Sequence, residues 1–370
     1  MEIFGALNGN ARLVGGAVRD ALMNVQAGDI DFATPYDPAQ IVALLEKKGI
    51  RTIPTGIKHG TVSALVNDTL YEITTLRRDE KTDGRHAEVA FTDSYEEDAR
   101  RRDFTINALY LDANGHLYDY TGGQEDIKNK HVRFIGNADE RICEDYLRLL
   151  RYFRFWGKMG HGRIDEEARQ ACTRQAEGLN QISKERKRDE LFKILMQNGA
   201  PITLRLMEQT GVLSYLLHRA DIQGLEKFLA VNAQAPLLQR LSILTGTCLP
   251  DLALSNVQKQ TLELFAQTAD LNAPLKNIKE LLYLKGLDAF QFYIKRALSF
   301  KQITPQQAKE YAALTLPVFP LTGGDLLAAG YKEGPQMKEL FMLAKSIWAD
   351  LDFTDNKILV LKALMTYNKK

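Results

Sequence analysis

The sequence is poor in cysteine and contains no long apolar run. Its 370 residues include three cysteines, Cys143, Cys172 and Cys248, which lie far apart and lack the short spacing of a metal site. We therefore expect no disulfide bond, as is typical of a reducing compartment. No apolar stretch approaches the length of a membrane span, and residues 1–10 lack the basic start and apolar core of a signal peptide. These absences predict a cytoplasmic protein without a membrane partner.

A surplus of charge of one sign is missing as well. Lysine and arginine number 48 against 47 aspartates and glutamates, which gives a net charge of +1. Because the surface as a whole is not basic, a surface for nucleic acid would have to arise from local clusters. The length exceeds that of one typical domain, so we expect two to four compact units.

The pattern of apolar residues changes once along the chain. Up to about residue 137, short apolar strands alternate with helices and polar turns. These strands are expected at residues 61–66, 71–75, 108–111 and 131–135. From about residue 138 onward, apolar residues recur at three- and four-residue spacing, which predicts helices. The expected fold class is therefore α+β. Its parts are a small mixed α/β head (1–137), then an all-helical neck (138–198), body (199–314) and tail (315–370).

The first chemical signal is a pair of glycines between a predicted strand and a predicted helix. Gly15 and Gly16 directly follow an apolar run, and residues 17–23 have a helical pattern. Such a turn lets a ligand approach the backbone and presents amide groups at a helix N-terminus, where phosphate is favoured. Arg19 would add a charged fork to the same anion. A glycine pair also occurs in ordinary tight turns, so this motif alone does not distinguish a phosphate-binding turn from such a turn.

A pair of carboxylates follows this turn after one short helix. Asp29 and Asp31 lie in a predicted strand over residues 28–32, and residues two apart on a strand project to the same side. Two such carboxylates suit Mg²⁺, which takes oxygen ligands and keeps substrate phosphates in its shell. Glu72, on a later predicted strand, is a candidate third carboxylate. An Asp-x-Asp sequence also occurs at solvated strand edges, but together with the glycine turn it predicts metal-dependent nucleotidyl transfer.

Two charged stretches come next in the sequence. Residues 76–86 contain glycine and almost no apolar anchor, which predicts a mobile loop. Further on, Arg102 and Asp103 end a run of three arginines at a helix-to-strand transition. Beside a phosphate site, arginine would neutralise the charge of a triphosphate, and Asp103 would accept a hydrogen bond from a ribose hydroxyl. As an alternative, both stretches are typical of charged surface segments that only contact solvent.

Arginines recur at regular spacing in the predicted neck. Arg148, Arg151 and Arg154 are three residues apart, and Asp145 precedes Arg148 by three, so on one helix these side chains share a face. A surface ladder of Asp–Arg pairs is the simple explanation. Alternatively, because aspartate only accepts and arginine only donates, the pair matches the polar edge of a nucleobase. Arg151 and Arg154 would then meet phosphates.

These motifs together resemble those of the class II tRNA nucleotidyltransferases, the CCA-adding enzymes, which belong with bacterial poly(A) polymerases. The resemblance is carried, between residues 11 and 195, by LVGGAVRD with DID, EITTLRRDEKTDGRH, RRDFTINALY, YTGGQEDI, EDYLRLLRYFRF and ISKERKRDEL. Beyond about residue 200 the likeness is looser. Tyr120 stands where many relatives have proline, and Lys187 where an apolar residue is common. The resemblance implies a polymerase-β-like head, a nucleotide-selecting neck and a tRNA-binding tail.

The resemblance also implies roles for individual residues. Asp29 and Asp31 match the catalytic, metal-binding carboxylates. Asp145 and Arg148 match the protein template that reads CTP or ATP. Residues 76–86 match a loop associated with the switch to ATP addition, which favours full CCA addition here. The expected nucleotide-binding residues are Gly15, Gly16, Arg19, Arg102, Asp103, Asp145, Arg148, Arg151 and Arg154.

The implied reaction joins two CMP and one AMP to the 3′ end of tRNA and releases pyrophosphate, without a nucleic-acid template. Two Mg²⁺ ions, CTP and ATP are expected in the head. The expected partner is tRNA, gripped at its acceptor arm and elbow; DNA is not expected. The alternatives are a bacterial poly(A) polymerase, a partial enzyme that adds only A or only CC, and a non-catalytic tRNA-binding module. No long basic extension precedes the end at Lys370, which speaks against the first, and the Asp pair speaks against the last.

Overall fold

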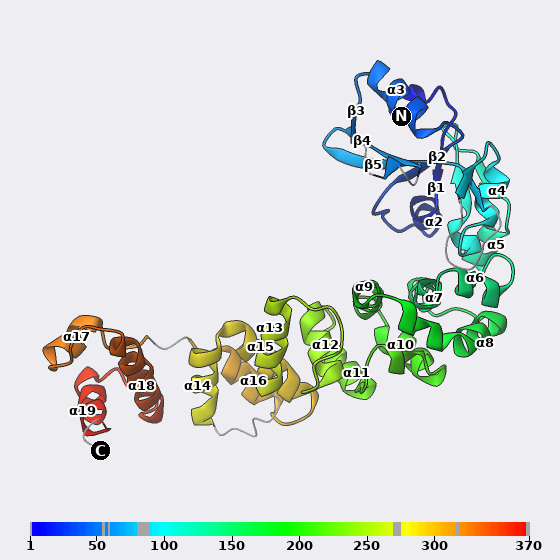
Figure 1. The fold of residues 1–370 in the computed structure, drawn as a ribbon. Coiled ribbons are helices and arrows are strands. Elements are labelled where there is room, and N and C mark those ends of the chain that lie inside the picture. Colours follow the sequence, from blue (N-terminus) through cyan, green and yellow to red (C-terminus); the bar gives the residue numbers. More distant parts are fainter. Residues whose placement is uncertain are drawn as a thin grey trace. The chain divides into compact units, whose positions relative to one another are not determined.

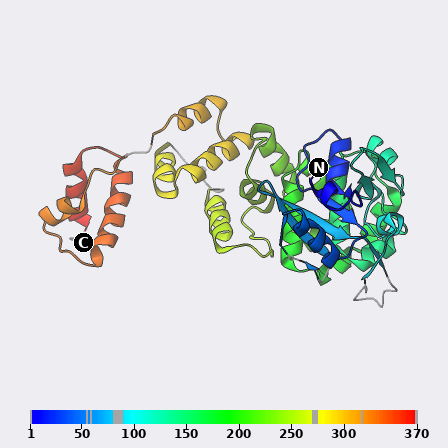
Figure 2. The same ribbon diagram turned by 90° about the horizontal axis from the view of Figure 1, so that it is seen from above.

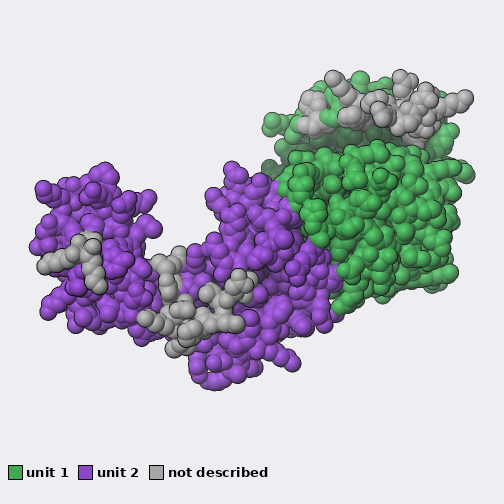
Figure 3. Space-filling view, turned by 60° about the horizontal axis from the view of Figure 1, so that its bottom comes forward, with its two compact units in different colours: residues 1–218, 251–253 green, residues 219–250, 254–370 purple. Residues whose placement is uncertain are grey.

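The computed structural model describes residues 2–53, 56–57, 60–79, 89–268, 275–315 and 318–367. The chain divides into two compact units, which are coloured separately in Figure 3. Unit 1 comprises residues 1–218 and 251–253, and unit 2 comprises residues 219–250 and 254–370. The described strands all lie in unit 1, whereas unit 2 is built of helices, so the expected α+β class is confirmed. The three cysteines are free.

A seven-stranded sheet forms the first part of unit 1 (Figure 1). The order of its strands is β3-β4-β5-β2-β1-β8-β9. Strands β2 and β5 run parallel, and the other neighbours in this sheet are antiparallel. A separate hairpin pairs β6 with β7. The strands are β1 (Arg12–Val14), β2 (Asp31–Thr34), β3 (Arg51–Ile53), β4 (Thr61–Val66), β5 (Thr69–Thr75), β6 (Arg77–Asp79), β7 (Val89–Phe91), β8 (Leu109–Leu111) and β9 (Leu117–Asp119).

Short helices surround this sheet, and longer ones follow it in unit 1. Pro38 begins α3 directly after the N-cap Asp37, whose side chain accepts a hydrogen bond from the Gln40 amide. The helices of unit 1 are α1 (Glu2–Ala6), α2 (Gly16–Leu22), α3 (Pro38–Lys47), α4 (Tyr95–Arg100), α5 (Gly123–Lys128), α6 (Ala138–Glu144), α7 (Leu147–Lys158), α8 (Glu166–Arg174), α9 (Lys184–Leu195) and α10 (Ala200–Gln209). The 3₁₀ turns are η2 (Thr105–Asn107), η3 (Ala176–Gln181) and η4 (Val212–Tyr215).

Unit 2 contains the remaining helices. Figure 2 shows the last three, coloured orange to red, as a group. Trp348 is buried in the core of this group. The helices of unit 2 are α11 (Ile222–Val231), α12 (Leu237–Thr245), α13 (Asn256–Gln267), α14 (Leu275–Lys285), α15 (Leu287–Ser299), α16 (Pro305–Ala312), α17 (Gly323–Ala328), α18 (Gln336–Asp350) and α19 (Lys357–Tyr367). Among the described residues, no helix has both the length and the apolar character to cross a bilayer.

The two faces of the sheet carry different cores. Phe32 of β2 and Ile73 of β5 are register partners, and both are buried with Ile41 of α3 in the larger core. Because side chains alternate along a strand, Asp31 and Glu72 point to the opposite face. That face carries a smaller core, which includes Val14, Ala33, Ala99 and Tyr110. Asp31 and Glu72 therefore lie on the same sheet face as α4.

Two predicted elements of the head were wrong. Residues 131–135 form no regular strand; one isolated bridge joins Phe104 to Phe134, because no neighbouring strand offers further partners. The strand expected over residues 28–32 begins only at Asp31, since Gly28 and Asp29 form a bend. Asp29 therefore lies just before the strand.

The predicted loop at residues 76–86 is only partly described. Leu76 is fully buried, and its amide donates to the Thr34 carbonyl at 2.8 Å. Arg77–Asp79 form β6, paired with β7. The prediction was wrong for these four residues because backbone pairing orders them in spite of their charge. Residues 80–86 lie outside the described residues.

Replacing Ile73 by alanine is expected to lower the free energy of unfolding of unit 1 by ~2–5 kcal/mol, because the side chain is fully buried. Leu70 on the same strand is 50% exposed, so Leu70→Ala is the matched control and should change stability far less. The two tryptophans lie in different units, so Trp348→Phe leaves Trp156 as the fluorescent reporter of unit 1. Urea unfolding in that background measures both variants, and equal effects would contradict the assigned core.

Candidate active site

The glycine turn connects β1 to α2. Gly15 has φ 72°, a left-handed conformation that glycine adopts without steric cost, and it precedes the first residue of the helix. A Cβ atom at Gly15 would lie 3.6 Å from Nη1 of Arg102, and one at Gly16 would lie 3.7 Å from Nη2 of Arg19. The turn therefore brings an open backbone close to two of the predicted arginines.

Carboxylates gather beside this turn. Asp31 is the register partner of Glu72 on the neighbouring parallel strand, and of Val14, just before the turn, on the other side. Burial raises the pKa of Asp31 above its ordinary value, and the negative charge of Glu72 raises it further. Arg102 acts in the opposite direction, and Asp29 again raises the pKa of Asp31. These four charged groups are thus near enough to interact.

The carboxylates fit a divalent cation that also binds substrate. In the described part of the chain, no group of three or more His, Cys, Asp and Glu side chains is arranged as a complete metal cage. Mg²⁺ commonly takes one or two protein carboxylates and completes its shell with phosphates and water. The oxygen donors of Asp29 and Asp31, with Glu72 next to them, match that preference, and a cation there would relieve their mutual repulsion.

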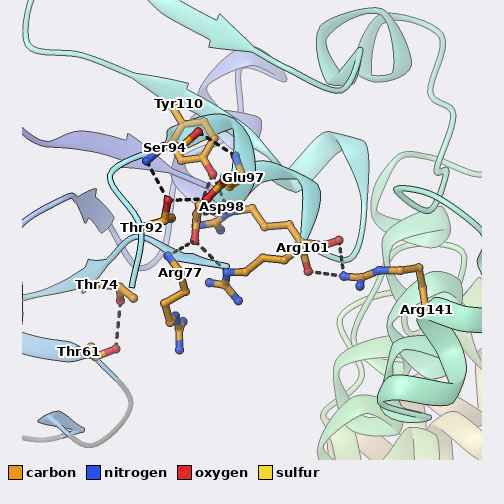
Figure 4. Close-up of polar contacts among 11 residues, drawn as sticks. Thr61, Thr74, Arg77, Thr92, Ser94, Glu97, Asp98, Arg101, Tyr110 and Arg141 are labelled. Carbon is orange, nitrogen blue, oxygen red and sulfur yellow. Dashed lines mark hydrogen bonds and ion pairs between the residues drawn. The ribbon is translucent and has the colours of Figure 1, made fainter. Parts of the chain in front are cut away.

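Arg102 is held by a carboxylate that the sequence patterns did not single out. Asp98 on α4 accepts hydrogen bonds from Nε and Nη2 of Arg102 at 3.1 and 2.9 Å, and from the Tyr110 hydroxyl at 2.7 Å. Figure 4 shows Asp98 among Arg77, Arg101 and Tyr110. Burial opposes ionisation, but Arg102 and Arg101 outweigh it and lower the pKa of Asp98 to about 2. The spacing of three and four residues between Asp98 and these arginines was the available signal.

Arg19 is buried and forms hydrogen bonds with two neighbouring side chains. Its Nε donates to Asp20 at 2.9 Å, and its Nη1 donates to the side-chain oxygen of Asn107. Asp20 also accepts from Lys158 of α7 at 2.8 Å. The arginine that was expected to contact phosphate therefore lies beside the turn, with its guanidinium oriented by two neighbours.

Asn107 connects Arg19 to a second arginine–carboxylate pair. Its side-chain amide donates to Asp103 at 3.1 Å, and Asp103 binds Nε and Nη2 of Arg151 at 2.7 and 2.6 Å. The Phe104 amide adds a fourth donor to Asp103. Burial would raise the pKa of Asp103, but Arg151 and these hydrogen bonds lower it. Asp103 is thus ionised and fully occupied, and Asn107 is a site residue that the sequence analysis missed.

The predicted template pair does not share one helix face. Asp145 is extended and lies before α7, which begins at Leu147; its Oδ1 accepts from the Leu147 amide at 3.1 Å. The expectation of a continuous helix over these residues was wrong, because the backbone is extended at Asp145, between α6 and α7. Its Oδ2 accepts from Arg186 at 2.9 Å, whereas Arg148 donates to Glu144 and to the Arg141 carbonyl.

Glu144 links this pair to the head. Arg141 donates to Glu144 at 2.8 Å and, through Nη2, to the carbonyls of Arg101 and Arg102 at the end of α4 (Figure 4). The same carboxylate binds Arg148. A chain of charged groups therefore runs from the backbone of Arg102 to Arg148.

Arg154 lies on α7 with Arg151. It donates to the buried Glu190 of α9 at 2.6 Å, and its guanidinium lies 4.1 Å from the ring centroid of Phe155. The guanidiniums of Arg19 and Arg151 lie 4.9 and 5.4 Å from the same centroid. Arg19, Arg151 and Arg154 are thus brought together around one aromatic ring.

The basic residues at the start of α9 are mostly paired. Ser183 is the N-cap of this helix and accepts from the Arg186 amide. Lys184 forms an ion pair with Asp251, and Arg188 with Asp189. The site therefore combines two carboxylates for a cation, an open turn and several oriented arginines, which together suit a bound polyphosphate.

Two family models match the sequence. The model of the Poly A polymerase head domain matches residues 11–133, which contain the glycine turn and the carboxylates. The model of the probable RNA and SrmB-binding site of polymerase A matches residues 163–222.

Individual relatives match over most of the chain. The mitochondrial CCA tRNA nucleotidyltransferase 1 of Homo sapiens is 37% identical over 392 residues, covering 100% of this chain and 88% of that protein. The CCA-adding enzyme of Bacillus subtilis is 34% identical over 350 residues, covering 86% of this chain and 84% of that protein. The structure of the Bacillus stearothermophilus CCA-adding enzyme in complex with CTP has 28% identity and a TM-score of 0.76, covering 99% of this chain and 96% of that chain.

In metal-free protein, Asp31→Asn is expected to raise the thermal unfolding midpoint at neutral pH. The pKa of Asp31 is raised in the folded state, so the free energy of unfolding falls as the pH rises from the ordinary value through the folded value. Above that window the ionised carboxylate destabilises the fold, and the neutral amide removes this effect.

Calorimetry in the presence of a chelator measures the midpoint. Asp93→Asn is the control, because Asp93 is exposed, and it should leave the midpoint unchanged. A midpoint for Asp31→Asn at or below that of the unmodified protein would contradict the raised pKa of Asp31.

Proposed function

This chain belongs to the CCA tRNA nucleotidyltransferase family, and we propose that its active site lies between the Gly15–Gly16 turn and the carboxylates Asp29 and Asp31. The protein joins CMP, CMP and AMP in turn to the 3′ end of tRNA and releases pyrophosphate. Its substrates are CTP, ATP and a tRNA that lacks part or all of this terminal sequence. The closeness of Asp31, Glu72 and Arg102 on one face of the sheet carries the proposal.

Asp29 and Asp31 hold two Mg²⁺ ions in this proposal. When bound, the ions lower the pKa of the terminal 3′-hydroxyl and stabilise the negative charge of the leaving pyrophosphate. Burial, and then the negative charges of Glu72 and Asp29, raise the pKa of Asp31, and a cation bound there would favour its ionised form. Glu72 adds to the negative potential at this position. No side chain is required as a general base.

The glycine turn and the arginines bind the triphosphate. The open backbone of Gly15 and Gly16 receives phosphate oxygens, and Nη1 of Arg102 points toward the same turn. Arg19 lies beside them, fixed by Asp20 and Asn107. Pairing of each guanidinium before the substrate arrives reduces the reorganisation that accompanies binding.

Asp103 acts in two ways in this proposal. It holds Arg151 of α7, and its carboxylate would accept a hydrogen bond from a ribose hydroxyl. A carboxylate offers about four acceptor positions. Asp103 already receives four donors, from Phe104, Asn107 and Arg151. A ribose hydroxyl must therefore replace one of them.

Asp145 and Arg148 select the nucleobase. Asp145 is an acceptor and Arg148 a donor, which together match the polar edge of cytosine or adenine. To reach the base, Asp145 must release Arg186, and Arg148 must release Glu144. These exposed or half-buried ion pairs are weak enough to exchange. A mismatched base would leave the pair without partners, which is the source of discrimination.

Contacts with the phosphates of tRNA come from scattered lysines and arginines, of which Lys187 on α9 is one candidate. Phosphate contacts release counterions, so tRNA affinity should fall steeply with salt. Recognition by shape rather than sequence suits a partner that is a stacked RNA helix.

Alanine at Asp29 or at Asp31 is expected to lower kcat by about a hundredfold or more, since the metal ions contribute several kcal/mol to the transition state. Incubation of tRNA lacking CCA with labelled CTP and ATP measures incorporation, and the length and composition of the product separate full CCA addition from A-only, CC-only and poly(A) addition. Asp93→Ala serves as the control, because Asp93 is exposed. Undiminished incorporation by Asp29→Ala would refute the proposed metal site.

Arg148→Ala is expected to relax nucleotide choice more than it weakens tRNA binding. Loss of a hydrogen-bonded recognition group typically costs about 1–3 kcal/mol of discrimination. The ratio of kcat/KM for CTP to that for UTP measures discrimination, and filter binding measures tRNA affinity. Arg169→Ala, which breaks an exposed pair with Glu166, is the control. An unchanged CTP/UTP ratio would remove Arg148 from the template.

A further inference from the structure

Asp98 is the most heavily bonded carboxylate near the site, and no role follows for it from the reaction as described. Its side chain is 2% exposed and lies on α4. Oδ1 accepts from the Arg77 amide at 3.2 Å and from Nε of Arg101 at 2.9 Å. Oδ2 accepts from Nε and Nη2 of Arg102 and from the Tyr110 hydroxyl. Five donors thus converge on one buried group, as the dashed lines of Figure 4 show in part.

A buried charge of this kind is expensive unless it is fully paired. Although burial favours the neutral acid, Arg102, Arg101 and the Tyr110 hydroxyl hold the pKa of Asp98 at about 2. The group is therefore ionised under all conditions in which the protein would act. The hydrogen bonds from the five donors offset the cost of burying this charge, and the same bonds fix the directions of the donor groups.

The two oxygens of Asp98 bind different sets of donors. Oδ1 binds the start of β6 and Arg101, whereas Oδ2 binds Arg102 and Tyr110. Nε of Arg102 also donates to the Tyr110 hydroxyl at 3.2 Å, so Asp98 and Tyr110 together form a rigid bracket. Two nitrogens of Arg102 donate to the same oxygen, Oδ2, and these bonds together with the one to Tyr110 fix the direction of the guanidinium.

The bracket leaves one end of Arg102 available. Nε and Nη2 are taken by Asp98, and within the described residues Nη1 has no hydrogen-bond partner. Nη1 lies 3.6 Å from the position of a Cβ at Gly15, so it faces the glycine turn. Arg102 also lowers the pKa of Asp31, which places its charge next to the carboxylates.

We propose that Asp98 is a positioning residue for nucleotidyl transfer, which aims Nη1 of Arg102 at the triphosphate by holding Nε and Nη2. The proposal rests on the proposed function, because it takes Arg102 as a triphosphate contact. In this proposal α4 does more than cover the sheet. Asp98 on this helix orients Arg102, which follows the C-terminal end of the helix. Since the triphosphate is common to CTP and ATP, the effect of Asp98 is the same for both nucleotides.

Asp98→Asn is the first test, since it keeps the shape and removes the charge. We expect kcat/KM to fall by about ten- to a hundredfold, the range found when a group that orients a functional side chain is lost. The fall should be equal for CTP and ATP, with tRNA affinity and the CTP/UTP ratio unchanged. Glu97→Gln is the matched control on the same helix, because Glu97 is exposed and bonds only to Thr92 among the described side chains. Loss of tRNA affinity instead of nucleotide kcat/KM would overturn the proposal.

A double-mutant cycle separates this proposal from the function on which it rests. If Asp98 acts through Arg102, Asp98→Asn should cost less than about twofold in an Arg102→Ala background. Independent, multiplying effects would overturn the positioning role while leaving Arg102 as a contact. An Arg102→Ala variant with unchanged kcat/KM would instead refute the proposed function of Arg102.

Arg102→Lys tests whether the orientation of the Arg102 guanidinium is required, even if Asp98→Asn does not fold. Lysine retains the charge, but its three donors lie on one freely rotating nitrogen, so Asp98 cannot hold one nitrogen while a second one faces the glycine turn, as it does with the planar guanidinium. We expect Arg102→Lys to lose nearly as much kcat/KM as Arg102→Ala. Activity equal to that of the unmodified protein would mean that charge alone suffices, and the orienting role of Asp98 would be wrong.

Discussion

Pairing of arginine with a buried carboxylate is the interaction on which the site depends. The acid partners are nearly inaccessible, with side chains 2–10% exposed, and each binds at least one guanidinium nitrogen within 3 Å. The pairs are Arg19–Asp20, Arg102–Asp98, Arg151–Asp103 and Arg154–Glu190. Such pairs add little net stability, since desolvation offsets the attraction. What they provide is direction: the guanidiniums are held in place before a polyanion arrives.

This pairing also explains how an almost neutral chain can present a cationic site. Every site arginine described above is matched by an acid, so the total stays at +1 while the local arrangement remains specific. Long-range attraction of a triphosphate is correspondingly modest, and short-range geometry does more of the work. Around Phe155, three guanidiniums approach one ring, and the aromatic face helps to hold like charges near each other.

Sequence patterns predicted what depends on neighbours along the chain. The strands at 61–66 and 71–75 and the switch to helices near residue 138 follow from local periodicity, and the structure has them. Two distant partners were not identified, because nothing local links Asn107 to Arg19 or Glu190 to Arg154 across 88 and 36 residues. The strand predicted at 131–135 failed since an apolar pattern does not supply a neighbouring strand. The prediction of a continuous helix through Asp145 failed because the backbone is extended there, between α6 and α7.

The parallel register of β2 and β5 limits which changes of length the head can tolerate. Asp31 lies opposite Glu72, and Phe32 opposite the fully buried Ile73. One residue added to or lost from β5 would exchange the two faces, burying a carboxylate in the larger core and setting an isoleucine beside Asp31. Homologous chains should therefore vary in length at hairpin ends and surface turns while these two strands keep their residue count.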